Sequence, residues 1–167
     1  GEYLVPRLNR ENKKIAIDGP VRVGGSEIAP RLVQRLLNDL GDDPDQLPIL
    51  QHALMRTWDH WLADHKEGEP LDLRHYEATG GMAQALSRHA DEVLAEASSE
   101  EEKELTRRLF QALTEKGPDN RGIRRPTSIE ELCVIVAAEK SDVTKIIDRF
   151  RKPGCTFLMP PVQVELS

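Results

Sequence analysis

The first candidate for chemistry is a glycine-rich stretch, Gly19–Ser26, which reads GPVRVGGS. Its two glycines and final serine have the spacing of a phosphate-binding loop, in which backbone amides and a lysine hold nucleotide phosphates. Gly25 stands where that lysine belongs, and the residues before the stretch are charged rather than typical of a buried strand. The sequence therefore favours a Gly/Pro turn between helices, with a phosphate loop as the alternative.

One pair of possible metal ligands, a histidine and an aspartate, has a suitable spacing. His60 and Asp64 lie four residues apart, so on a helix they share one face. No third ligand follows at a spacing that suits zinc, and the pattern favours ordinary surface side chains. Cys133 and Cys155 are the only cysteines, and neither has a histidine nearby in the sequence. We expect no catalytic centre and no metal site among these residues.

Basic residues near the end of the chain are candidates for DNA contacts. Residues 121–152 carry eight basic and five acidic side chains, whereas the whole chain has a net charge of −6. Asp142 and Asp148 share the basic segment, and basic residues at a helix C-terminus complement its dipole in any case. DNA binding is therefore kept as an alternative. Its candidate contacts are Lys145, Arg149, Arg151 and Lys152.

The elements that position these residues are predicted to be helices around a central one, Asp45–Leu62. Asp45 is expected to cap this helix, and Pro48 is tolerated in its first turn because the missing amide would have no intrahelical partner. A second clear helix runs from Pro30 to Leu40 and ends at Gly41. The buried face of the central helix is expected to comprise Leu47, Leu50, Leu54, Trp58, Trp61 and Leu62.

Further helices are predicted on both sides of these two. One runs from Asn9 to about Asp18, where Gly19 and Pro20 stop it. A short helix covers Arg74–Thr79, and a capping box of Ser99 with Glu102 opens a later one. Between them lies a long helix, Met82–Ala97, whose inward residues are expected to be Met82, Leu86, Ala90, Val93 and Leu94.

The chain changes character at 117–121 (GPDNR), a cluster of turn formers where the charge balance changes sign. Beyond it, a capping box of Ser128 with Glu131 opens one helix and Ser141 is expected to cap the next, which makes a helix-turn-helix. Two apparent strands, Cys155–Met159 and Val162–Leu166, would complete a winged helix. We predict a mainly α chain, with a helical bundle over 1–116, a linker at 117–121 and a small, C-terminally truncated winged-helix domain with a short β-hairpin over 122–167.

Three segments resemble the bacterial novel STAND P-loop NTPases, a class often fused to WD-repeat propellers. They read YLVPRLNRENKKIAIDGPVRVGG, IAPRLVQRLLNDLGDDPDQLPILQHALMRTWDHW and LDLRHYEATGGMAQALSRHADEVL, and 47–54 (LPILQHAL) is the most specific element. The resemblance implies that the helical bundle is the lid of a signalling ATPase and that the tail RFRKPGCTFLMPP belongs to its winged helix. It also implies a P-loop core before Gly1, a propeller after Ser167 and self-association through the full-length ATPase.

The same resemblance implies one nucleotide contact. Related proteins carry a Gly-x-Pro motif whose proline packs near the adenine; Pro48 occupies that position, but Gln46 replaces the glycine. The alternative is that Pro48 only starts its helix. ATP or ADP with magnesium would bind the full-length protein, while this chain alone would hold no cofactor and catalyse nothing.

Two other classes of function stay open, a DNA-binding winged-helix regulator and a structural scaffold for protein interactions. No apolar run approaches membrane-spanning length and no signal peptide is recognisable. The two cysteines are too few for a disulfide framework, which suits a reducing compartment. We therefore expect a cytoplasmic protein with no membrane partner.

Overall fold

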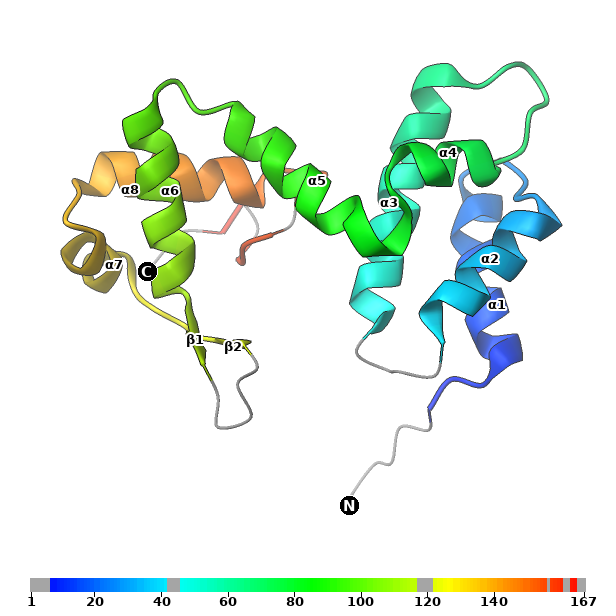
Figure 1. Ribbon diagram of the computed structural model, residues 1–167, viewed down its shortest axis with the longest axis horizontal. Helices are drawn as coiled ribbons and strands as arrows, with labels where there is room; N and C mark the ends of the chain where they lie inside the picture. Colours follow the sequence, from blue (N-terminus) through cyan, green and yellow to red (C-terminus); the bar gives the residue numbers. More distant parts are fainter. Residues whose placement is uncertain (1–6, 42–45, 117–121, 156, 161–162, 165–167) are drawn as a thin grey trace. The chain divides into compact units, whose positions relative to one another are not determined.

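The computed structural model describes residues 7–41, 46–116, 122–155, 157–160 and 163–164. These residues form eight helices and one two-stranded sheet, which confirms the prediction of a mainly α chain with a short hairpin (Figure 1). The elements are α1 (Arg10–Val23), α2 (Pro30–Leu40), α3 (Leu47–Asp64), α4 (Leu73–Ala78), α5 (Gly81–Ala95), α6 (Glu100–Ala112), β1 (Thr114–Lys116), β2 (Gly122–Arg124), α7 (Ile129–Val136) and α8 (Lys140–Arg151).

The chain divides into two compact units, Gly1–His89 and Ala90–Ser167. The division falls within α5, which contributes Met82 and Ala85 to the first core and Val93 to the second. The predicted linker at 117–121 lies outside the described residues. The strands on either side of it, β1 and β2, pair with each other inside the second unit, which also contains α6. The structural division therefore comes earlier in the chain than the division predicted from composition.

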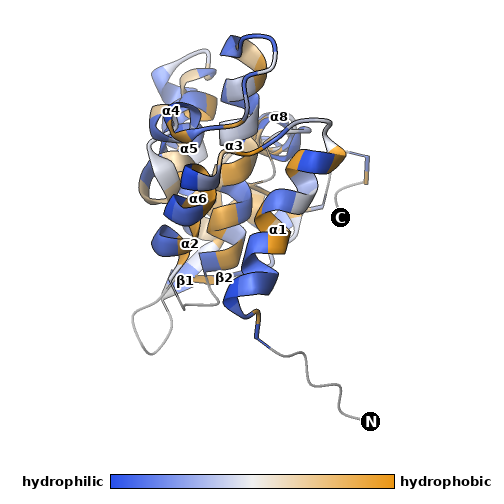
Figure 2. Cartoon of the chain, turned by 90° about the vertical axis from the view of Figure 1, so that its right-hand side faces the viewer, coloured by the Kyte–Doolittle hydropathy of each residue, from blue (hydrophilic) through white to orange (hydrophobic). Residues whose placement is uncertain are grey.

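The first core is built around α2, whose bounds match the prediction. Its apolar residues recur at helical spacing, and Pro30 begins it at a position where the missing amide costs little. The residues that α2 buries are Leu32, Val33, Leu36, Leu37 and Leu40. Burial of each contributes about 1.5–3 kcal/mol, so this stripe outweighs most local preferences in the unit. The other helices also carry both hydrophobic and hydrophilic residues along their length (Figure 2).

The prediction for α1 was wrong at its end, because the helix continues through Gly19 and Pro20 to Val23. A proline inside a helix costs about 3 kcal/mol through a lost hydrogen bond and a steric clash. Ile17 and Val21, which flank Pro20 on the buried side, are 0% and 4% exposed. Burying both side chains contributes about 3–6 kcal/mol, which offsets the cost of the proline.

The inward faces of α3 and α5 are rotated slightly from the predicted ones. In α3, Leu50 and Trp61 are buried as expected, but Leu62 is 54% exposed. Leu62 follows Trp61 by one residue and so lies about 100° further around the helix. In α5, Leu86 is 43% exposed and Ala85 is buried instead. The predicted cap Asp45 lies outside the described residues.

The second unit packs α6 against α7 and α8. The Oγ of Ser99 accepts the Glu102 amide at 3.2 Å, and the Oγ of Ser128 accepts the Glu131 amide at 3.2 Å. Both serines are therefore N-caps, which confirms the serine half of each predicted capping box. The helix α8 begins one residue before Ser141, which is therefore not its cap. The buried apolar residues of α8 are Val143, Ile146, Ile147 and Phe150.

The hairpin lies before α7, not at the end of the chain. β1 and β2 are antiparallel, with Glu115 opposite Ile123. The prediction of a strand over Cys155–Met159 was wrong for its described residues, because Cys155 is irregular and Phe157–Met159 form bends. The amides of Phe157 and Leu158 donate to the Phe150 carbonyl at 3.0 and 3.2 Å, so they close the C-terminus of α8 rather than pair with a strand. Of Val162–Leu166, only residues 163–164 are described, and they form a turn and a bend.

Candidate functional site

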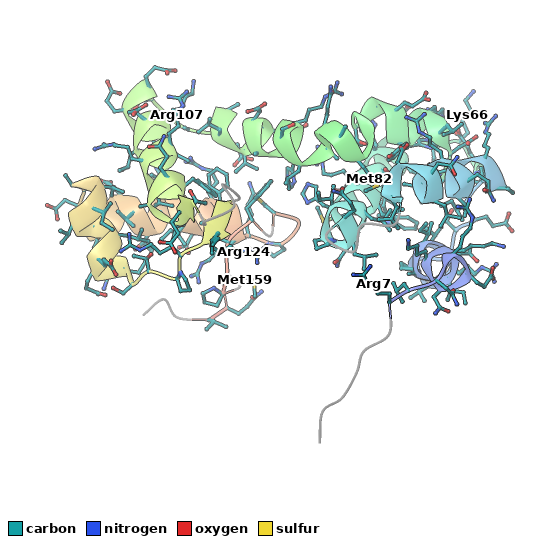
Figure 3. The ribbon with its side chains drawn as sticks, turned by 60° about the horizontal axis from the view of Figure 1, so that its bottom comes forward. Arg7, Lys66, Met82, Arg107, Arg124 and Met159 are labelled. Atoms are coloured by element: carbon teal, nitrogen blue, oxygen red, sulfur yellow. The ribbon has the colours of Figure 1, made fainter. Side chains whose placement is uncertain are left out.

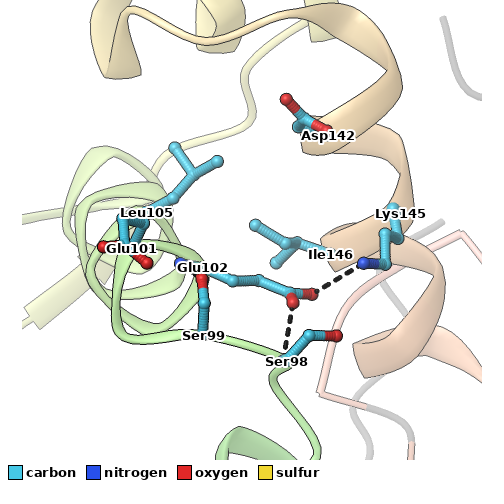
Figure 4. Close-up of a pocket in the computed structure, with 8 residues that line it drawn as sticks. All are labelled: Ser98, Ser99, Glu101, Glu102, Leu105, Asp142, Lys145 and Ile146. Atoms are coloured by element: carbon cyan, nitrogen blue, oxygen red, sulfur yellow. Dashed lines mark hydrogen bonds and ion pairs between the residues drawn. The ribbon is translucent and has the colours of Figure 1, made fainter.

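Two of the four basic residues predicted for DNA contacts meet one carboxylate inside the second unit. Lys145 and Arg149 lie one turn apart on α8, and both pair with Glu102 of α6. The distance from Arg149 Nη2 to Glu102 Oε1 is 2.5 Å, and that from Lys145 Nζ is 3.4 Å. The amide of Ser98 donates to Oε2 of the same carboxylate at 2.8 Å (Figure 4). The first turn of α6 thus holds the basic face of α8.

Burial and charge make this cluster stronger than the usual surface ion pair. The side chains of Glu102 and Arg149 are only 12% and 11% exposed. The hydrogen bond from the Ser98 amide, together with Arg149 and Lys145, lowers the pKa of Glu102 to about 2, although burial acts in the opposite direction. Nη1 of Arg149 is buried and has no hydrogen-bond partner among the described residues. Without the Glu102 carboxylate, the guanidinium would be a buried charge lacking its counter-ion.

The other two basic residues have partners of their own. Nε of Arg151 donates to Asp148 at 2.7 Å, and its Nη1 donates to the carbonyl of Val164 at 2.8 Å. Its side chain is 6% exposed, so Arg151 is part of the interior of the unit. Lys152 Nζ lies 2.8 Å from a carboxylate oxygen of Glu96. All four candidates therefore neutralise acidic side chains of this same chain.

A hollow of about 340 Å³ lies beside the Glu102 cluster. Its charged lining residues are Glu101, Glu102, Asp142 and Lys145, three acids and one base, and Figure 4 shows Asp142 on α8 across from the α6 residues. A surface with this balance repels phosphate groups, because DNA affinity depends on cations that replace its counter-ions. The most basic-looking segment of the sequence thus presents an acidic hollow.

Some other ion pairs among the described residues are exposed and contribute little. Arg107 of α6 projects outward (Figure 3) and pairs with Glu104 at 3.2 Å, with both side chains more than half exposed. Exposed pairs of this kind are worth about 0–1 kcal/mol. They serve below as controls for the Glu102 cluster.

Pro48 lies in the first turn of α3, in the first unit, and its side chain is exposed. Gln46, which takes the place of the family's glycine, lines a hollow of about 310 Å³ together with Arg35, Asp39, Gly80 and Gly81. The prediction that Pro48 contacts an adenine stays a prediction. Its neighbourhood offers a polar hollow and an accessible proline ring.

The polar residues of this hollow form a network that the sequence analysis missed. The Tyr76 hydroxyl donates to Asp39 at 2.7 Å and accepts the Met82 amide at 2.9 Å, and Arg35 pairs with Asp39 at 2.9 Å. Burial, followed by the Asp39 hydrogen bond, raises the pKa of Tyr76 to about 12. Gly81 has a φ of +61°, and a Cβ there would lie 3.2 Å from the tyrosine ring. The dipeptide Gly80-Gly81 was the available signal, since two glycines before a helix indicate a constrained turn.

The glycine-rich stretch forms the end of α1. Gly24 is the C-cap, and its amide donates to the Pro20 carbonyl at 3.0 Å. A Cβ at Gly24 would lie 2.5 Å from the ring of Trp58, so the glycine makes room for α3. A phosphate loop needs the positive N-terminal end of a helix, whereas a helix C-terminus presents carbonyls and partial negative charge. This geometry favours the turn over the phosphate loop.

The histidines and cysteines form no metal centre in the described part of the chain, where no group of three or more potential ligands occurs. His60 and Asp64 are both exposed. Cys133 is half-buried and Cys155 is buried. His52 and His89 contact each other, which the sequence gave no reason to expect because they are 37 residues apart.

Among the described helices, none is long and apolar enough to cross a membrane.

Comparison with known proteins gives one match. No curated protein and no solved structure matches the chain. The family model described as Novel STAND NTPase 1 matches residues 1–164, nearly the whole sequence. The chain therefore belongs to the Novel STAND NTPase 1 family.

Proposed function

We propose that this chain is the helical lid and winged-helix region of a bacterial STAND signalling ATPase. In this role it closes over a nucleotide that another part of the full-length protein holds, and it transmits the nucleotide state to attached domains. The family match over residues 1–164 is the observation that carries the proposal. The proposed partners are a P-loop core and a WD-repeat propeller of the same protein, in the cytoplasm, with self-association through the full-length ATPase.

The residues of this chain do not fit the phosphates of ATP. Gly25 replaces the lysine of a phosphate loop, and the glycine-rich stretch ends a helix instead of starting one. In P-loop enzymes, the lysine, the loop amides and the magnesium supply most of the phosphate binding and catalysis. We therefore assign no step of ATP hydrolysis to this chain. Its proposed share in binding ATP or ADP with magnesium is the adenine contact of Pro48.

The lid role requires two states that the nucleotide favours unequally. Two compact units, each with its own core, suit such a role because each can keep its internal packing while the protein changes state. The inward pairing of Lys145 and Arg149 supports it as well, since those cations serve contacts within the protein. A protein-interaction scaffold remains the alternative for the isolated chain.

Calorimetric titration of the chain with magnesium and ATP tests this proposal. We expect no measurable heat of binding and no hydrolysis, because the phosphate-binding groups are supplied by another part of the protein. Micromolar affinity, or turnover that is lost in a Ser26→Ala variant, would overturn the lid assignment.

In the full-length protein, Pro48→Ala is the matched experiment. If Pro48 packs against the adenine, the variant weakens ADP binding by about threefold to tenfold, as expected for about 1 kcal/mol of lost apolar contact. Pro30→Ala is the control, because Pro30 also starts a helix. Equal ADP affinities in the two variants would leave Pro48 as a helix-starting residue only.

A further inference from the structure

Two imidazole rings contact each other within the first unit, between α3 and α5. His89 Nδ1 lies 3.2 Å from His52 Nε2, the ring centroids are 5.1 Å apart, and the ring planes are tilted by 31°. His89 is only 6% exposed, and His52 is half-buried. His89 is also the last residue of the first unit, so this contact lies where the chain passes into the second unit.

The chemistry of this contact depends on the number of protons that the two rings share. A hydrogen bond between two imidazoles needs one N–H and one lone pair at the facing nitrogens. The first added proton can enter the remote nitrogen of the donor ring, so the bond persists and gains a charged donor. The second added proton takes the last facing lone pair, and two cations with opposed N–H groups then face each other.

The surroundings disfavour the doubly protonated pair. Burial is the main cause that lowers the pKa of His52, and Arg56 one turn along α3 acts in the same direction. Asp59 on α3 and the backbone hydrogen bond with Ala85 on α5 act in the opposite direction. The Arg88 guanidinium on α5 donates to the Ala78 carbonyl at 3.2 Å, and Glu92 follows His89 by one turn of α5.

We propose that His52 and His89 form a proton-sensitive latch that holds the first-unit part of α5 on α3 and opens when both rings are protonated. With Ala85 four residues before His89, His52 contacts two successive turns of α5, so loss of the pair loosens the last turn of α5 in the first unit. The stimulus is acidification below about pH 6, near the ordinary range of histidine. This inference rests on the contact itself and does not depend on the proposed lid role.

Nuclear magnetic resonance of the imidazoles in the complete chain tests the shared proton. We expect the pair to titrate in two macroscopic steps separated by more than one pH unit. In His89→Gln, the remaining ring should titrate in one step. Two independent steps at the same pH in the wild-type chain, unchanged for His52 in His89→Gln, would overturn the proposal.

Hydrogen exchange at pH 7 and pH 5 tests the opening. After correction for the intrinsic pH dependence of exchange, the amides of Ala85–His89 should lose protection at least tenfold in the wild-type chain. Gln offers an acceptor at either pH, so His89→Gln should change less than twofold, and His60→Gln should behave as the wild type. Circular dichroism at pH 8 checks that the variants fold. An equal loss of protection in His89→Gln would show that another group opens α5 and would refute the latch.

Discussion

At the scale of single residues, two glycines leave room for aromatic rings of neighbouring residues. Gly24 leaves space for the Trp58 ring, and Gly81 leaves space for the Tyr76 ring. Gly24 has a φ of −70°, which any residue can adopt, so its identity is required by the ring and not by the backbone. Gly81 has a positive φ, so both reasons apply there.

Gly24→Ala should therefore destabilise the first unit by about 1–3 kcal/mol, the usual cost of overpacking a filled site. The control is Gly19→Ala in the same helix, because a Cβ there meets nothing within 4 Å. Alanine favours helix over glycine by about 0.5–1 kcal/mol, so this second variant should be neutral or more stable. Urea denaturation measures both; equal midpoints would mean that the Trp58 ring can move aside freely.

At the scale of elements, one carboxylate connects α6 to α8. Glu102 accepts the Ser98 amide where α6 begins and pairs with Lys145 and Arg149 of α8. At the end of α8, Arg151 connects the helix to the tail, because its guanidinium donates to the carbonyl of Val164. The Arg151 bond, with the amides of Phe157 and Leu158 that donate to Phe150, holds the described part of the tail against α8 where a strand was predicted.

Glu102→Gln should lower the free energy of unfolding by about 2–4 kcal/mol, because it leaves the largely buried Arg149 cation without its counter-ion. Glu104→Gln is the control on the same helix, where the pair with Arg107 is exposed, and its cost should stay below about 1 kcal/mol. Denaturant titration at pH 7 compares the two. Similar costs would mean that solvent screens the Glu102 cluster.

At the scale of the whole molecule, stability comes from two separate cores, and α5 contributes to each. The first unit holds His52, His75 and Glu69 with shifted pKa values, and the second unit holds the Glu102 carboxylate. In α4, His75 is 1% exposed, and its Nδ1 accepts the Asp72 amide at 3.0 Å. The response of the molecule to acid follows from these groups.

Acidification should reduce stability in two pH ranges. Burial lowers the pKa of His75, so below about pH 6.5 the unfolded chain binds more protons and the free energy of unfolding falls with pH. The pKa values of Glu102 and Glu69 are about 2, so their contribution is present above about pH 4.5 and lost between there and pH 2.

His75→Gln separates the two ranges, because glutamine at this capping position can still accept the Asp72 amide but takes no proton. Denaturation midpoints between pH 3 and pH 8 should fall less between pH 7 and pH 5 in this variant than in the wild type, and equally below pH 4.5. An unchanged decline above pH 5 would assign that range to other groups.

Whether the chain binds DNA depends on where its cations lie in the folded molecule. Because the cations of α8 are paired internally, selection from randomised duplexes at physiological salt should enrich no motif; low salt would let any basic patch hold phosphates. A true regulator would prefer its site about a thousandfold or more. Recovery of a consensus that Lys145→Ala abolishes would favour the regulator over the lid.

The sequence by itself determined the elements whose signals are local. The apolar stripe and the proline of α2 gave its bounds, and the serines before α6 and α7 gave their caps, because periodicity and capping act within a few residues. The family resemblance was likewise readable from contiguous segments. The turn alternative for the glycine-rich stretch was right in kind, although the turn comes at Gly24 and Gly25 rather than at Gly19.

Only the tertiary structure decided which surfaces and charges become partners. Glu102 meets Arg149 across 47 residues of sequence, and His52 meets His89 across 37. Leu62 and Ala85 show the same limit, because periodicity fixes a stripe to within one residue and packing selects which neighbour is buried. The amides of Phe157 and Leu158 bond back to the last turn of α8, and the hairpin of the described residues is the pairing of β1 with β2 instead. The basic residues that the sequence suggested for DNA contacts form ion pairs within the chain. The sequence shows which residues are charged, but not how close they lie to one another.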